Sequence, residues 1–146
     1  MLENPKNGQT VYFIENLDTP IIKGQLISNA IREDIIGAAT DHPQVVKRYQ
    51  IDKQYYVDEY GNRLDSYGWG EFNWGVYAPI EKTFATAKEA AVYLKKAEKE
   101  QTDEWMEETN TLEGLLNFPL KYAVSGDEPY WFAQQFYKKR IKDFIK

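Results

Sequence analysis

The sequence contains no cysteine and only one histidine, His42. The absence of cysteine excludes disulfides, thiolate nucleophiles and cysteine-ligated metals. A histidine-based triad would depend entirely on His42, and no serine lies in a G-x-S-x-G motif. H-E-x-x-H and the carboxylate spacing of a calcium loop are also absent. We therefore expect no catalytic site, no metal site and no cofactor.

The chain also lacks an excess of basic residues and any long apolar run. Its 146 residues include 23 acidic and 18 basic side chains, for a net charge of −5. Direct nucleic-acid binding is normally supported by a basic balance, so we do not expect it. No stretch approaches the ~18 apolar residues of a membrane span, and residues 1–8 have no apolar core of a signal peptide. We expect a soluble cytoplasmic protein without a membrane partner.

The strongest positive signal is a change of hydrophobic period at residues 84–91, from about two to about 3.6 residues. Thr86 and Glu89 have the spacing of a capping box, in which the Thr86 side chain accepts from the N–H of Glu89 and the Glu89 carboxylate accepts from the N–H of Thr86. The sequence therefore predicts a helix that begins at Thr86, with a β-rich part before it and a helical part after it.

Short β-branched and aromatic runs predict the strands of the β-rich part, 10–14, 21–27, 45–51 and 54–58. Asp52-Lys53 is expected to separate the last two. Residues 30–36 either form a helical turn or extend the second strand, and residues 37–43 form a loop. The expected turn at residues 59–63 contains Gly61.

The helical part begins with an apolar stripe that starts at Ala87 and ends at Trp105. A shorter helix is expected from about Leu112 until Pro119 stops it, and a third carries Tyr130 to Ile145 after an Asp127 cap. We thus expect an α+β fold, a small twisted antiparallel sheet followed by two or three packed helices. Residues 1–146 would form a single domain, β-rich over 10–84 and helical over 86–145.

Acidic residues are concentrated between Glu98 and Glu113, where seven carboxylates accompany a single lysine, Lys99, for a local net charge of −6. A solvated helix face is the simplest interpretation. The sharper one is a partner-binding face on which carboxylates imitate a row of phosphates while Trp105 turns toward the core. The residues of this acidic face are Glu100, Asp103, Glu104, Glu107 and Glu108.

A second candidate surface is the run Tyr67–Tyr77, which holds five aromatic residues and three glycines. The glycine spacing misses the dinucleotide-binding fingerprint. Three interpretations stay open for Trp69 and Trp74: packing within the sheet, an exposed protein-binding patch, and a platform on which sugar rings stack.

Three segments resemble small accessory proteins of phages and mobile elements of Gram-positive bacteria. In that group a short antiparallel sheet ends in F-x-T-x-x-E-A and a helix. The segments here are Tyr12-Phe13-Ile14, Tyr55 to Asn62, and Phe84 to Ala91 with Leu94. The resemblance covers roughly residues 10–97. It implies binding to a host or bacterial-immunity protein rather than catalysis, and it assigns no functional residue.

These observations together predict a non-enzymatic protein-binding module. We expect a phage-derived inhibitor that acts in the bacterial host cytoplasm and occludes a surface of a larger defence or host protein through the acidic face. One alternative is a glycan-binding module or small carbohydrate-active enzyme that uses Trp69 and Trp74. Another is a structural, self-assembling protein. Whether the chain forms a homo-oligomer stays open.

Overall fold

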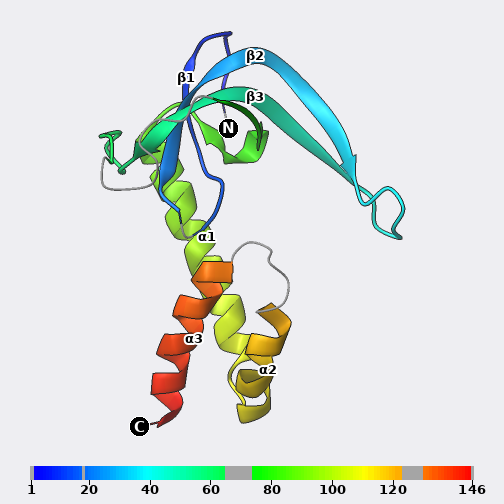
Figure 1. Cartoon of the computed structure of the whole chain (residues 1–146), viewed down its shortest axis with the longest axis vertical. Helices are drawn as coiled ribbons and strands as arrows, with labels where there is room; N and C mark the ends of the chain where they lie inside the picture. Colours follow the sequence, from blue (N-terminus) through cyan, green and yellow to red (C-terminus); the bar gives the residue numbers. More distant parts are fainter. Residues whose placement is uncertain (1, 18, 65–73, 123–129, 146) are drawn as a thin grey trace. The chain divides into compact units, whose positions relative to one another are not determined.

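The computed structural model describes residues 2–17, 19–64, 74–122 and 130–145. They form five strands, a 3-10 turn and three α-helices, in the chain order β1 Thr10–Phe13, β2 Ile21–Ile36, β3 Gln44–Val57, β4 Trp74–Pro79, η1 Ile80–Lys82, β5 Thr83–Phe84, α1 Ala87–Glu108, α2 Leu112–Tyr122 and α3 Tyr130–Ile145 (Figure 1). The antiparallel sheet followed by helices confirms the α+β class.

The chain divides into two compact units, which are described separately below. The sheet unit comprises Met1–Glu15 and Thr19–Tyr93, and the helical unit comprises Asn16–Asp18 and Leu94–Lys146. Helix α1 supplies residues to both. The expected single domain stays a prediction.

The sheet unit is built on one antiparallel sheet with the order β4-β3-β2-β1-β5. Its core is an apolar cluster to which the three central strands contribute most, and which includes the fully buried Val11, Ile22 and Ile51. The first turns of α1 bury small residues, among them Ala87 and Ala90, as their spacing predicts.

Strand β3 corrects one expectation from the sequence. Residues 45–51 and 54–58 are not two strands separated by a turn, because Asp52 pairs with Gln25 and Lys53 with Gly24 inside one continuous strand. Lys53 is buried, and its ammonium lies 2.7 Å from the carboxylate of Glu15. The polar pair 52–53 resembles a turn locally, but a carboxylate distant in sequence makes it compatible with a strand interior.

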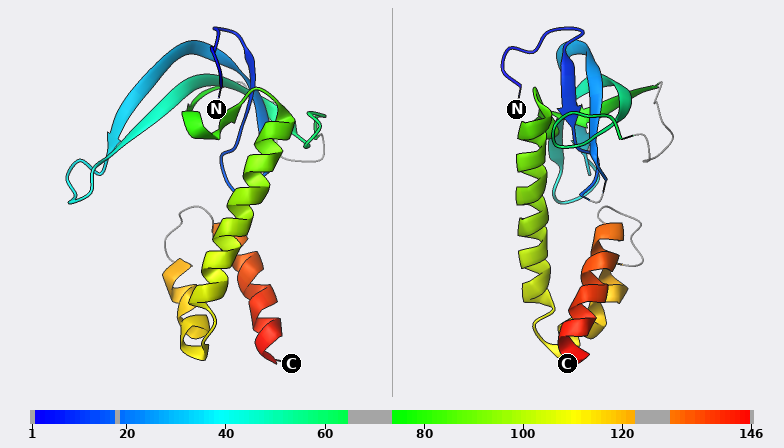
Figure 2. Two further views of the ribbon diagram at one scale, coloured as in Figure 1. Left: turned by 180° about the vertical axis from the view of Figure 1, so that it is seen from behind. Right: turned by 90° about the vertical axis from the view of Figure 1, so that its left-hand side faces the viewer.

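Strand β2 is longer than the expected strand 21–27, because it continues to Ile36. Of the two alternatives for residues 30–36, strand extension is the one that forms. Within the described residues, β1 pairs with β2 only as far as Gln25, and β4 pairs with β3 only as far as Arg48. Beyond these points β2 and β3 continue as a two-stranded hairpin arm, residues 28–47, that extends past the rest of the sheet (Figures 1 and 2).

The predicted start of α1 is confirmed: the helix begins at Ala87, directly after Thr86, and Thr86 caps its first turn. The hydroxyl oxygen of Thr86 accepts a hydrogen bond from the backbone N–H of Glu89 at 3.2 Å. This contact satisfies one of the N–H groups that a helix leaves without a partner at its first turn. The turn at residues 59–63 also forms, with Gly61 at φ +85°.

Helix α2 begins as expected but does not end at Pro119. The Thr111 hydroxyl accepts from the N–H of Gly114 at 3.1 Å, and the helix continues through Pro119 to Tyr122. Proline removes one intrahelical hydrogen bond and crowds the preceding turn, which is why we expected it to stop the helix. Leu115 and Phe118 are buried, and this packing outweighs the local preference.

Candidate protein-binding surfaces

The helical unit is organised around the indole of Trp105, which is fully buried. Its ring centroid lies 5.4–5.5 Å from those of Phe118, Phe132 and Phe136, and the Phe118 ring meets it edge-on at 82°. Contacts of this kind contribute beyond the apolar area they bury. Trp105 therefore determines which side of α1 faces inward, as its helical spacing predicts.

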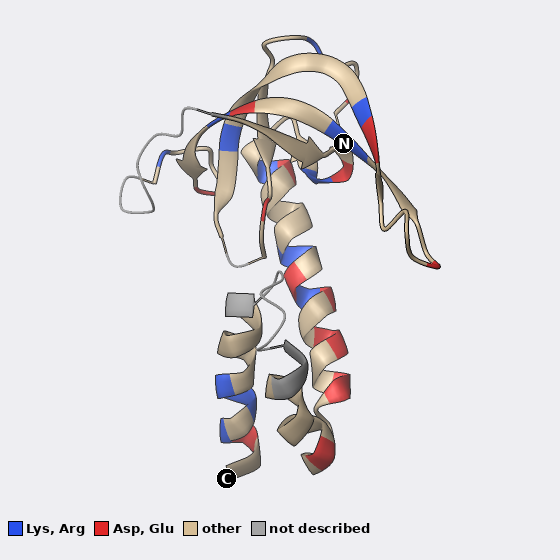
Figure 3. Ribbon diagram, turned by 45° about the vertical axis from the view of Figure 1, so that its right-hand side comes forward, with Lys and Arg blue, Asp and Glu red and all other residues tan. Residues whose placement is uncertain are grey.

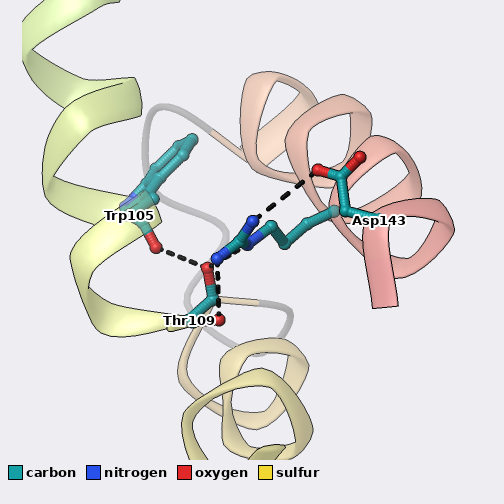
Figure 4. Close-up of polar contacts among 4 residues, drawn as sticks. Trp105, Thr109 and Asp143 are labelled. Carbon is teal, nitrogen blue, oxygen red and sulfur yellow. Dashed lines mark hydrogen bonds and ion pairs between the residues drawn. The ribbon is translucent and has the colours of Figure 1, made fainter. Parts of the chain in front are cut away.

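A polar contact closes the C-terminal end of α1 (Figure 4). The buried Thr109 hydroxyl donates to the Trp105 carbonyl at 2.7 Å. The Arg140 guanidinium from α3 donates to that hydroxyl at 3.1 Å and to the Thr109 carbonyl at 3.3 Å, and it also pairs with Asp143 at 3.6 Å. Arg140 thus supplies a cation to the negative end of a helix whose own last turn contains no basic residue.

The acidic face runs along the second half of α1, where acidic residues predominate (Figure 3). Glu100, Asp103, Glu104 and Glu107 are exposed, and Glu108 is half-buried. Positions 100, 104 and 107 recur at intervals of four and three, so their side chains form one stripe. The structure therefore brings together the five acidic residues that the sequence identified.

Two neighbouring charged residues differ from this stripe. Burial raises the pKa of Glu98, whose side chain lies off the exposed stripe. Lys99 pairs with Asp103 at 2.9 Å, and the hydrogen bond raises the pKa of the ammonium. Both partners are more than 60% exposed, so this ion pair contributes little to stability.

The acidic face is unfavourable for the helix that carries it. Carboxylates at spacings of three and four repel one another along the stripe. Glu104, Glu107 and Glu108 also occupy the last turns of α1, where the helix dipole favours cations. Stability alone would therefore select a different set of side chains here.

Most of the aromatic run, residues 67–73, lies outside the described residues. Trp69 lies outside the described residues. Trp74 begins β4 and pairs with Lys53, but its side chain lies outside the described part of the structure. The three interpretations of Trp69 and Trp74 therefore stay predictions.

The hairpin arm is a surface that the sequence analysis did not identify. Its large apolar side chains are exposed, including Ile31 at 47%, Ile35 at 65% and Val45 at 61%. Ile35 and Val45 are direct cross-strand partners. The β-branched residues Ile31, Ile35 and Ile36 were the available signal, but a strand was only one of two interpretations of this segment.

The opposite face of the arm carries a charged cluster. Asp34 lies between two arginines, with its carboxylate 3.0 Å from Arg32 Nε and 3.6 Å from an Arg48 nitrogen. The Arg32 guanidinium also lies 4.4 Å from the centre of the exposed Tyr77 ring. The pKa of Arg32 is raised, first by the hydrogen bond to Asp34 and then by Tyr77.

The described residues contain no cluster of histidines and carboxylates that could hold a metal ion. None of the helices in the same part of the chain is long and apolar enough to cross a membrane. His42 is exposed in the loop of the hairpin arm. No family model, curated protein or solved structure matches this chain. The resemblance to phage accessory proteins therefore stays a prediction.

Proposed function

We propose that the protein is a non-enzymatic binding module that engages a basic surface of a larger protein through its acidic face. The observation that carries this proposal is the position of the carboxylates, which crowd the C-terminal turns of α1 at a cost to the helix. Lys99 pairs with Asp103 and Arg140 offsets part of the helix dipole, but residues 98–113 keep a net charge of −6. Residues that break a local rule commonly serve function. A complementary row of lysines or arginines on a partner would relieve both the mutual repulsion and the clash with the dipole.

Other features support a binding role for this face. The stripe is exposed, and the buried indole of Trp105 and the Arg140 contact to Thr109 hold the helix from its opposite side. A preorganised row of charges costs less to dock than a mobile one. The resemblance of residues 10–97 favours a target in a bacterial host, and we propose a defence or host protein whose surface is occluded on binding.

The experiment compares two variants with equal changes in net charge. The test variant reverses the face with Asp103→Lys, Glu104→Lys and Glu107→Lys. The matched control reverses exposed acids of the sheet unit with Glu3→Lys, Asp41→Lys and Glu81→Lys. Each intact protein is immobilised to capture partners from a bacterial lysate, followed by mass spectrometry and by titration of the captured protein.

We expect the original chain and the control to retain one common partner and the test variant to lose it. Binding should weaken as salt rises, because the screening length falls from ~10 Å at 0.1 M to ~3 Å at 1 M. The free energy of unfolding of the test variant should stay equal or rise by up to about 1 kcal/mol, because the dipole and the repulsion now favour it. A partner held equally by the test variant at high salt would refute the role of the acidic face.

A further inference from the structure

The outer edge of β2 in the hairpin arm is an open strand edge. Among the described residues, β1 pairs with β2 only to Gln25, and the segment before β1 bonds β2 only as far as Asn29. Residues 32–36 therefore pair with β3 on one side alone, after a bulge that ends at Arg32. An edge strand with exposed apolar side chains is a template for another strand. Ile31 and Ile35 provide such side chains on one face.

The sequence of this edge is complementary to itself. When Ile31-Arg32-Glu33-Asp34-Ile35 is placed antiparallel to a second copy with Glu33 opposite Glu33, each Ile31 faces Ile35 of the other copy. Each Arg32 then faces Asp34 of the other copy. Directly opposed apolar pairs and opposite charges both stabilise antiparallel strands.

The charges already present on the arm favour the same register. Arg32 and Arg48 share the single carboxylate of Asp34, so this cluster has a net charge of +1 and accommodates a second carboxylate. On the other face, Glu33 lies opposite Lys47 at 3.8 Å in its own chain, which reduces the repulsion between two glutamates that meet at the symmetry axis.

Neighbouring registers are worse. A shift by one residue in one direction pairs Arg32 with Glu33 but puts Ile31 opposite Asp34. A shift in the other direction pairs Ile31 with Ile36 but puts Glu33 opposite Asp34, so only the register centred on Glu33 satisfies both the apolar and the charged residues. The open edge of β3 beyond its pairing with β4, residues 44–47, contains the cation Lys47 and no carboxylate that could pair with it in a second copy. The edge of β2 is therefore the self-complementary one.

We propose that two copies of the chain associate through the outer edges of β2, antiparallel and centred on Glu33, to form a symmetric dimer with one continuous sheet. The occupant of this edge is a second copy, because both the apolar pairs and the charge pairs are satisfied by the same segment. Such a two-fold interface is isologous and closes upon itself. This proposal is independent of the acidic face, which belongs to the helical unit.

Reciprocal charge reversals test the proposed register. In Arg32→Asp each symmetric pair becomes carboxylate against carboxylate, and in Asp34→Arg it becomes guanidinium against guanidinium. Like charges directly opposite destabilise pairing, so we expect each variant to dimerise at least about tenfold more weakly than the original chain. An equimolar mixture of the two restores two opposite-charge pairs and should form a heterodimer.

Masses from light scattering over a concentration series measure these states, with 17.1 kDa for one chain. The proposal expects a dimer for the original chain, monomers for both variants and a dimer for their mixture. An original chain that is monomeric throughout refutes it, and so do single variants that dimerise as well as the original. Capture of a different protein by this edge, with the original chain monomeric, would assign the edge to another partner.

A second measurement does not depend on the charged variants folding. The chain has no cysteine, so Glu33→Cys introduces a unique thiol at the proposed axis, where directly opposed Cβ atoms lie about 4.5–5.5 Å apart. Lys47→Cys is the matched control on the same face, and its two copies would be separated by three strand spacings of roughly 4.8 Å. With oxidised glutathione as the oxidant, we expect the Glu33→Cys variant to form a disulfide-linked dimer and the Lys47→Cys variant to form little. Equal yields from the two variants, or no linked dimer from Glu33→Cys, would overturn the proposal.

Discussion

The contact between Arg140 and Thr109 predicts a large and specific loss of stability. Arg140→Met keeps a long apolar side chain. It removes the two charge-assisted hydrogen bonds that the guanidinium donates to the fully buried Thr109, at 3.1 Å to the hydroxyl and 3.3 Å to the carbonyl oxygen. Hydrogen bonds to charged groups contribute about 1.5–3 kcal/mol, and these two share one side chain. We therefore expect the free energy of unfolding to fall by about 2–3 kcal/mol.

The matched control is Lys142→Met, an exposed lysine of the same helix, which should change stability by no more than about 0.5 kcal/mol. Arg140→Lys should fall between the two, because an ammonium keeps the charge at the end of α1 but cannot reproduce the two-point contact of the planar guanidinium. The assay is urea denaturation followed by circular dichroism. At this chain length each kcal/mol should also lower Tm by roughly 2–4 °C.

A double-mutant cycle separates this contact from other effects of Arg140, including its pairing with Asp143. Thr109→Val removes the hydroxyl but leaves the Thr109 carbonyl and the shape of the side chain. The losses of Arg140→Met and Thr109→Val should be non-additive by about 0.5 kcal/mol or more, since both remove the same hydrogen bond. If Arg140→Met costs no more than Lys142→Met, or if the two losses simply add, the guanidinium does not stabilise the end of α1.

Two further predictions concern local structure. Thr86→Ala should lower the free energy of unfolding by about 1 kcal/mol, measured in urea, whereas Thr86→Ser should keep the cap; equal values for both would refute the assignment. In the turn at 58–63, the hydrogen bond from the backbone N–H of Asn62 and then that of Tyr60 hold the pKa of Asp58 below its ordinary value of 3.8. The carboxylate therefore stabilises the turn fully above pH 3.8 and loses this effect as pH falls through the lower pKa of the folded state. The amide NMR shift of Asn62 should titrate at that lower pKa. A titration midpoint at or above 3.8 would contradict a lowered pKa for Asp58.

Several elements could be predicted from the sequence because their determinants are local. The start of α1 follows from Thr86 and Glu89, which lie within one turn of each other. The inward position of Trp105 and the exposed stripe opposite it follow from helical spacing alone. The turn at Gly61 follows from a residue that tolerates positive φ.

Other elements depended on partners that are distant in the sequence. Asp52-Lys53 resembles a turn until Glu15 and the opposing residues Gly24 and Gln25 are placed beside it. Gly24 itself lies where an added Cβ would approach the Asp52 carbonyl oxygen to 2.7 Å, a constraint that appears only once the two strands are paired. Pro119 is retained inside α2 by packing that no local rule includes.

The sequence by itself determined the division into a β-rich part and a helical part, the cap of α1 and the acidic stripe, because hydrogen bonds and periodicities within a few residues define them. Only the tertiary structure decided that β2 and β3 extend beyond the strands that pair with them, β1 and β4, and leave an open edge at Ile31 to Ile35. It alone decided, too, that Arg140 meets Thr109 at the end of α1. Which strand ends where, and which side chain reaches a helix end, depends on contacts between segments far apart in the chain.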